Sequence, residues 1–171
     1  MDLTLAGLTN QAIRVHGNTY TRSFPEAASQ SFNAGDFVGV NSSGQVAIAA
    51  TAGNTLDSTG IRLIGRAKEK ASGTTNNYVQ VEVATGDTYY DLPAYHATPA
   101  SAVTAETSVD VQCVLINETT GGWMADFATT SNPVLQIVGI PKSYDGNALT
   151  VGGLYNSFKV KIMGIERFDQ S

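Results

Sequence analysis

The sequence has little of what disulfide-linked, metal-binding and membrane-spanning proteins need. It holds one cysteine and two histidines among 171 residues. Because Cys113 is the single cysteine, an intrachain disulfide is excluded. Its place in the apolar run VDVQCVLIN predicts that its side chain is a small buried hydrophobic group rather than a nucleophile. No apolar run approaches the roughly 20 residues that span a bilayer, and the first residues, MDLTLAGLTNQ, lack the basic region and apolar core of a secretory signal. We expect a soluble protein with no membrane partner, not exported by that route.

Positive charge is also scarce, and it is unevenly placed. The formal net charge is -5, and no lysine or arginine occurs between Lys70 and Lys142. The carboxylates inside that gap are Glu82, Asp87, Asp91, Glu106, Asp110, Glu118 and Asp126. Nucleic-acid binding needs several cations along a phosphate track, and no other segment supplies a basic cluster. The charge pattern therefore predicts that nucleic acid is not a partner.

The common catalytic and phosphate-binding motifs are missing as well. The chain has no G-x-S-x-G elbow, P-loop, H-E-x-x-H, C-x-x-C or EF-hand spacing. His16 and His96 have no carboxylate or second histidine at ligand spacing. Asp87 and Asp91 in GDTYYDLPAY share one face of an extended segment, but without a third oxygen ligand they favour a solvated edge over a catalytic or calcium site. We expect no enzyme activity, no bound metal and no cofactor. The enzymatic alternative is a hydrolase that uses Asp87 and Asp91.

The residues that are abundant are typical of short strands joined by tight turns. The chain contains 17 glycines and is rich in threonine, serine, asparagine, valine and alanine. At this length one domain can bury its own core. We predict an all-β fold, a compact β-sandwich or a partly open β-barrel, over residues 34–171. Residues 1–33 are polar, contain Pro25 and show one short strand-like segment, QAIRVHG, which predicts an extended N-terminal arm.

The strand pattern occurs twice along the chain. In residues 34–86, the hairpin DFVGVN-SSG-QVAIAA precedes a second hairpin made of IRLIGRAKE and YVQVEVAT. In residues 111–164, VLIN-ETTGG-WMADFA, QIVGIPK and YNSFKVKIMG follow in the same order, roughly 75 residues later. Two pseudo-repeated units on a shared core are therefore predicted. The long connection over residues 87–110 contains Pro93 and Pro99, which argue against a central strand there.

Four aromatic residues in the connection and the second unit are candidates for a binding surface. They are Tyr89, Tyr90, Tyr95 and Trp123. Large exposed aromatic side chains are typical both of subunit interfaces and of sugar-stacking platforms. The sequence favours an interface and leaves a glycan platform open.

The pair Gly35-Asp36 stands where the predicted arm ends and the first hairpin begins. The second copy of the pattern has no Gly-Asp pair before its hairpin, so Asp36 is not part of the repeat. A catalytic role shared by both units is therefore not expected for Asp36, and the pair marks a boundary.

The order of AGDFVGVNSSGQVAIAA, LIGRAKEKASG and YVQVEVATG resembles the capsid decoration, or cement, proteins of tailed bacteriophages. Those proteins show an aG-D-x-V hairpin, a later iG-x-A element and a closing V-x-V strand. The resemblance covers residues 33–86 and, through the repeat, 111–164 more loosely. It implies a small, β-tulip-like protein without enzymatic activity. The arm and the wide middle connection go beyond the compact core of that family.

The resemblance also implies a place and a partner. Such a protein is made in the host cytoplasm and binds the outer capsid surface of the virion, commonly as a homotrimer at three-fold and quasi-three-fold positions. The major capsid protein is then the expected partner, and Arg14, Arg22 and Phe24 are the expected capsid-binding residues. Deleting residues 1–33 should abolish capsid binding and leave the body folded. The alternative function is a receptor- or glycan-binding module of a phage fibre or baseplate.

Overall fold

The computed structural model describes residues 13–51, 53–56, 60–95, 109–119, 122–129, 131, 133–139 and 157–164. Within these ranges every helix or strand element is a strand. The strands are β1 (Arg14–His16), β2 (Thr19–Pro25), β3 (Phe37–Asn41), β4 (Val46–Ile48), β5 (Asn54–Thr55), β6 (Ile61–Ala67), β7 (Tyr78–Ala84), β8 (Tyr89–Tyr95), β9 (Gln112–Glu118), β10 (Gly122–Asp126), β11 (Leu135–Gly139) and β12 (Ser157–Ile162). The predicted all-β fold is confirmed.

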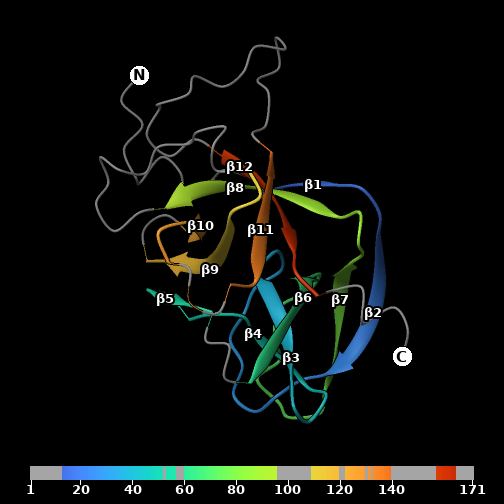
Figure 1. Ribbon diagram of the computed structural model, residues 1–171. Coiled ribbons are helices and arrows are strands. Elements are labelled where there is room, and N and C mark those ends of the chain that lie inside the picture. Colours follow the sequence, from blue (N-terminus) through green and yellow to red (C-terminus); the bar gives the residue numbers. More distant parts are fainter. Residues whose placement is uncertain are drawn as a thin grey trace, which may run out of the picture.

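The strands form two barrels with the same strand order (Figure 1). The first has the order β2-β7-β6-β3-β4, and a single parallel bridge from Glu26 to Val46 joins β4 back to the end of β2. The second has the order β8-β12-β11-β9-β10, and a parallel pairing of β10 with β8 closes it. Each strand of the first barrel thus has a counterpart at the same place in the second. Two pseudo-repeated units are confirmed, and the architecture is the predicted barrel rather than the sandwich.

A β-bulge occurs on β6 of the first barrel and on its counterpart β11 of the second, although the ladders concerned are not equivalent: β6 is bulged against β3, and β11 against β12. The register of β6 against β3 skips Ile64, and the register of β11 against β12 skips Val138. In each case a glycine follows, Gly65 or Gly139. A bulge adds one unpaired residue and increases the local twist, which helps a short sheet curl into a barrel. It also explains why the consecutive residues Leu63 and Ile64 are both buried.

The segment predicted as an arm belongs to the body over residues 13–33. All seven residues of β2 pair with β7, β1 pairs with β8, and Phe24 and Phe32 lie in the core. The prediction of a detached arm is therefore wrong for these residues, and residues 1–12 lie outside the described part of the chain. The polar composition of this segment did not reveal the strand, because β2 completes the barrel by backbone pairing. Such pairing leaves little trace in the pattern of side chains.

The predicted connection over residues 87–110 also contains a strand. β8 pairs with β1 at residues 89–91, with β10 at residues 94–95 and with β12 at residues 90–93. Pro93 is opposite Ser157, the first residue of β12, and follows the stretch that pairs with β1. A proline is tolerated where one ladder ends and another begins, so the argument against a strand here was wrong.

The two barrels share one hydrophobic core and exchange strands. β1 precedes the first barrel but pairs with β8 of the second, and β5 lies between β4 and β6 but pairs with β9. At the junction, the ring of Phe37 packs edge-on against Tyr90 and Trp123, with centroids 5.0 Å and 5.5 Å away. Most buried hydrophobic residues of both units form one cluster, while Ile116 and Met124 of the second barrel form a small separate one. The predicted shared core is confirmed.

Candidate functional site

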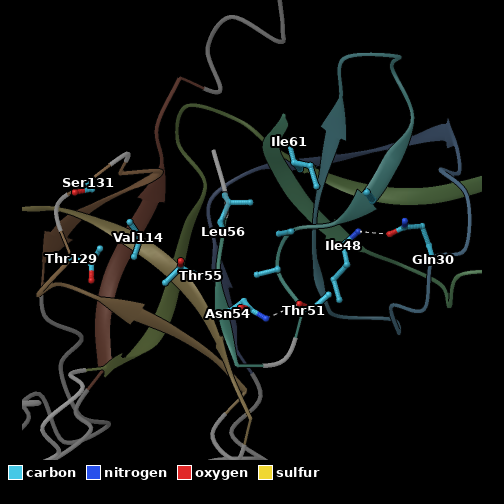
Figure 2. A pocket seen from close by; sticks show the side chains of 13 residues that line it. Gln30, Ile48, Thr51, Asn54, Thr55, Leu56, Ile61, Val114, Thr129 and Ser131 are labelled. Carbon is cyan, nitrogen blue, oxygen red and sulfur yellow. Dashed lines mark hydrogen bonds between the residues drawn. The ribbon is translucent and has the colours of Figure 1, made fainter. Parts of the chain in front are cut away.

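A groove of about 720 Å³ lies between the two barrels (Figure 2). Val114, Thr129 and Ser131 come from the second barrel, and Ile48 and Gln30 face them from the first. The polar side chains of its lining are all amides and hydroxyls: Gln30, Thr51, Asn54, Thr55, Thr129 and Ser131. Among the described residues that line the groove no side chain is titratable, and their amides and hydroxyls can bind a ligand by hydrogen bonds and van der Waals contact.

The amides of this inter-barrel groove have structural partners. Gln30 Oε1 accepts a hydrogen bond from the Ile48 amide at 2.9 Å, and Gln30 Nε2 donates to the Ala28 carbonyl at 3.0 Å. Asn54 Nδ2 donates to Thr51 Oγ1 at 2.9 Å. The Gln30 side chain thus takes the place of a neighbouring strand at β4, which covers backbone that would otherwise be a free sheet edge.

A second groove, of about 500 Å³, lies on the surface of the first barrel. It is formed by β2, β3, the turn at residues 41–44, β6 and the start of β7. Among the described residues of its lining, the charged ones are Arg22 and Arg62. Tyr78 is 72% exposed. We call this the Arg22 groove, defined by Arg22, Arg62, Tyr78 and the 41–44 turn.

The Arg22 groove is held in shape by local contacts. The guanidinium carbon of Arg22 lies 5.2 Å from the centre of the Phe24 ring. Stacking uses the flat face of a guanidinium, whereas its five N–H donors point outward in its plane. On the opposite rim, Asn41 Oδ1 accepts hydrogen bonds from the Ser43 and Gln45 amides, both at 2.9 Å. The groove therefore presents a positioned guanidinium beside a turn that is fixed by its own asparagine.

Of the three residues predicted to bind a capsid, the structure brings Arg22 and Phe24 together and places Arg14 on a different strand, β1. Arg22 is exposed and lies in the Arg22 groove. Arg14 is also exposed, but it lies on β1, opposite Asp91 of the second barrel. Phe24 is only 5% exposed and belongs to the core, so it is not an exposed anchor as predicted. Its role is to support Arg22 from below.

The aromatic set does not form a surface platform. Tyr90 and Trp123 are buried at the barrel junction against Phe37, while Tyr89 and Tyr95 are half-buried. Burial raises the pKa of the Tyr90 phenol above its ordinary value. The prediction of these four residues as a shared interface or glycan platform is therefore wrong for Tyr90 and Trp123, because the two-barrel junction needs them as core.

Asp36 links the boundary of the first unit to the second barrel. Its Oδ1 accepts a hydrogen bond from Trp123 Nε1 at 2.9 Å, and its Oδ2 accepts one from the Asn33 amide at 2.8 Å. Nearby, Arg66 Nε donates to the Gly35 carbonyl at 2.8 Å. The Gly-Asp pair is thus a structural joint between the start of the first hairpin and the second barrel.

Replacing Asp36 should weaken this joint. Asp36→Ala removes the acceptor of both hydrogen bonds, so we expect a loss of about 1 to 3 kcal/mol in the free energy of unfolding. Asp36→Asn keeps a carbonyl for Trp123 and should lose less. Chemical denaturation followed by the fluorescence of Trp123 measures both losses. An unchanged midpoint for Asp36→Ala would show that the joint contributes nothing.

Asp87 and Asp91 bind different partners. Asp87 accepts hydrogen bonds from the hydroxyl of Thr85 and from Asn18 Nδ2, the latter at 2.7 Å. The Thr85 bond holds the pKa of Asp87 below its ordinary value. Asp91 Oδ2 lies 2.8 Å from His16 Nε2 and ties β8 to β1. These contacts are structural, and they do not assemble the two carboxylates as a catalytic pair.

Cys113 is buried in β9 and has no disulfide partner. Burial, with a smaller contribution from the Asp126 carboxylate, raises the pKa of its thiol from 9.0 to about 12. The thiolate, which is the nucleophilic form, is therefore disfavoured at neutral pH. The prediction of a buried structural cysteine is consistent with this environment.

Sequence reasoning missed two residues of the Arg22 groove, Arg62 and Tyr78. For Tyr78 the signal is present in YVQVEVA, because Tyr78, Gln80 and Glu82 alternate with buried valines and so face outward. For Arg62 the signal is weak, since the bulge at Ile64 breaks the alternation along β6. The groove itself depends on pairing between distant strands, which a local pattern does not reveal.

Among the residues that the structure describes, no group of three or more histidine, cysteine or acidic side chains is arranged to hold a metal ion. The same part of the chain contains no helix that is long and apolar enough to cross a bilayer. His96, the other histidine of the sequence, lies outside the described residues.

Comparison with known proteins adds no relative. No family model matches the chain, and no curated protein or solved structure matches it.

Proposed function

We propose that the chain is a structural decoration protein of a tailed-phage head, a non-enzymatic protein that binds the outer capsid surface and stabilises it. The observation that supports this most is the placement of the three elements that carry the resemblance. The β3–β4 hairpin with its Gly-Asp start, the L-I-G bulge of β6 and the V-x-V strand β7 are direct neighbours in the first barrel. They act as one structural unit, and the second barrel repeats it.

The architecture suits such a role physically. Barrels leave few free sheet edges, so many copies can be held close together on a lattice without pairing edge to edge. The shared core and the exchanged strands β1 and β5 make the two barrels one stiff body. A protein that binds only the assembled shell stabilises it by mass action, and the effect multiplies over every occupied site. A stiff protein loses less conformational entropy when it binds, so more of its interaction energy is available to stabilise the shell.

The test is binding to heads of the phage that encodes the chain, purified without it. We expect the full-length protein to co-sediment with these heads at saturating stoichiometry and to raise the temperature at which they release DNA. The mass of the free protein reports whether the proposed homotrimer forms before docking. If the protein stays in the supernatant at every concentration and the heads are no more stable, the proposal is wrong.

The inter-barrel groove supports a second candidate function, in which the chain is a glycan-binding module of a fibre or baseplate. Its amide and hydroxyl lining matches the hydrogen-bonding groups of a neutral sugar, although Tyr89, Tyr90, Tyr95 and Trp123, the residues considered for a glycan platform, are not among its described lining residues. A glycan array probed with the full-length protein distinguishes the two functions. Binding that is lost in Thr129→Val, together with no affinity for heads, would favour the second candidate.

A further inference from the structure

We propose that the outer face of strands β1, β8 and β12 is a docking site for an acidic segment of a partner protein, an extended stretch with carboxylates on alternate residues. We call this surface the basic face, defined by Arg14, His16, Lys159 and Lys161. The inference deepens the proposed function and rests on it for the identity of the partner, since it says which surface meets the shell and what chemistry the shell offers there.

Strand pairing brings cations from distant segments onto the basic face. Arg14 of β1 lies opposite Asp91 of β8, and Asp91 lies opposite Lys159 of β12. Residues directly opposite one another in a ladder have their side chains on the same face of the sheet. Lys161 lies two residues beyond Lys159 on the same strand, so it shares that face. The beginning and the end of the described chain thus contribute to one surface.

The basic face points away from the core. Along β12, Lys159 and Lys161 alternate with residues that are buried. The two lysines are half-buried, as is common for lysines whose stems lie along neighbouring side chains while the ammonium stays in water. Arg14 is exposed, and the side chain of His16 is 40% exposed. The positive charges therefore lie on the outside of the second barrel.

One carboxylate, Asp91, lies within the basic face. Its side chain is only 11% exposed, and its Oδ2 is 2.8 Å from His16 Nε2. Asp87 stands two residues before β8 begins, where Thr85 and Asn18 donate hydrogen bonds to it. Three permanent cations against one recessed carboxylate leave an excess of two positive charges, on a chain whose net charge is -5. The basic face is therefore opposite in charge to the protein as a whole.

The spacing of the cations fits an extended acidic peptide. Lys159 and Lys161 are about 7 Å apart along β12, which is also the spacing of alternate side chains in an extended ligand. Arg14 is two strand spacings from Lys159, about 10 Å across the sheet. Ammonium and guanidinium groups both make charge-assisted hydrogen bonds to carboxylates. A nucleic acid is not the favoured occupant, because three cations with Asp91 among them do not make a phosphate track.

The first experiment maps binding on the full-length protein by NMR titration. The probes are the peptide (Glu-Ser)4, the neutral peptide (Gln-Ser)4 and single-stranded oligothymidylate. We expect the glutamate peptide to shift the resonances of Arg14, Lys159 and Lys161, and to lose affinity as salt is raised. The neutral peptide and the oligonucleotide should leave those resonances unchanged. Equal shifts with oligothymidylate would overturn the acidic-protein assignment in favour of a phosphate site.

Matched variants separate the basic face from general electrostatics. Lys159→Gln with Lys161→Gln should weaken binding of the glutamate peptide about five- to tenfold. The control, Lys68→Gln with Lys70→Gln, removes the same charge from exposed positions outside the basic face and should change affinity little. Arg14→Gln changes a different strand of the face and should weaken binding about two- to fivefold. Equal losses in the two lysine pairs, or no loss in Arg14→Gln, would overturn the site.

The same variants on phage heads distinguish this inference from the proposed function. If wild-type protein and the control pair bind heads while the pair at Lys159 and Lys161 binds weakly, both stand. If all three bind heads equally, the basic face is not the docking site and the decoration function survives. If wild-type protein binds the glutamate peptide at the basic face but never binds heads, the site stands and the proposed function fails.

Discussion

Removal of residues 1–33 is expected to abolish the folded state rather than to detach an arm from an intact body. The deletion removes β1 and β2, so the first barrel loses the strand that pairs along the whole of β7. It also removes Phe24 and Phe32 from the core. Each buried phenylalanine contributes about 3 to 5 kcal/mol, which together compares with the whole stability of a typical domain, about 5 to 15 kcal/mol.

The measurement is a comparison of two truncations by circular dichroism and urea denaturation. The variant lacking residues 1–33 should show no cooperative transition or should not be recovered as soluble protein. The variant lacking residues 1–12 keeps every described strand and should unfold with the midpoint of the full chain. A cooperative, wild-type-like transition in the variant lacking residues 1–33 would mean that β2 does not hold the first barrel together. The proposed capsid binding should therefore be tested with the variant lacking residues 1–12.

The parts of the fold that could be predicted are those encoded locally. The β3–β4 hairpin, the alternation in β7 and the order of strands in the second unit all follow from short apolar periods separated by turn residues. The repeat reinforced them, because the same order appeared twice. β2 and β8 could not be found this way. Each closes a barrel by pairing with a strand far along the chain, and β8 carries Pro93, so their side chains give a weak or contrary signal.

The candidate sites were harder to predict than the fold. The cluster of tyrosines near residue 90 suggested an exposed surface, but Tyr90 faces the junction of two barrels that the sequence does not place together. The indole N–H of Trp123 donates a hydrogen bond to Asp36, which lies 87 residues away in the sequence. Arg22 as a capsid-binding residue stays a prediction, whereas its neighbours in the groove lining, Arg62 and Tyr78, come from strands whose adjacency depends on the closed topology. Sites made by long-range pairing leave little trace in local sequence.

Gly65→Ala is expected to destabilise the protein strongly, even though it adds a single methyl group. A Cβ at this position would lie 2.0 Å from the carbonyl oxygen of Glu82 and 3.1 Å from Val83 Cα, both backbone atoms of β7. The residue also has φ of 156°, which side chains rarely adopt. Overpacking and backbone strain together predict a loss of about 2 to 6 kcal/mol, because β7 must move away from β6.

Gly44→Ala is the matched control for this substitution. Gly44 has a φ of 76°, but a Cβ there would meet nothing within 4 Å. It therefore suffers backbone strain alone, about 1 to 2 kcal/mol. Trp123, the single tryptophan and a neighbour of Phe37, reports unfolding of both variants by fluorescence during urea denaturation. If Gly65→Ala is no less stable than Gly44→Ala, close approach of β6 to β7 does not explain the glycine. If Gly65→Ala is much less stable, the glycine of the iG-x-A element is required by the close packing of β6 against β7.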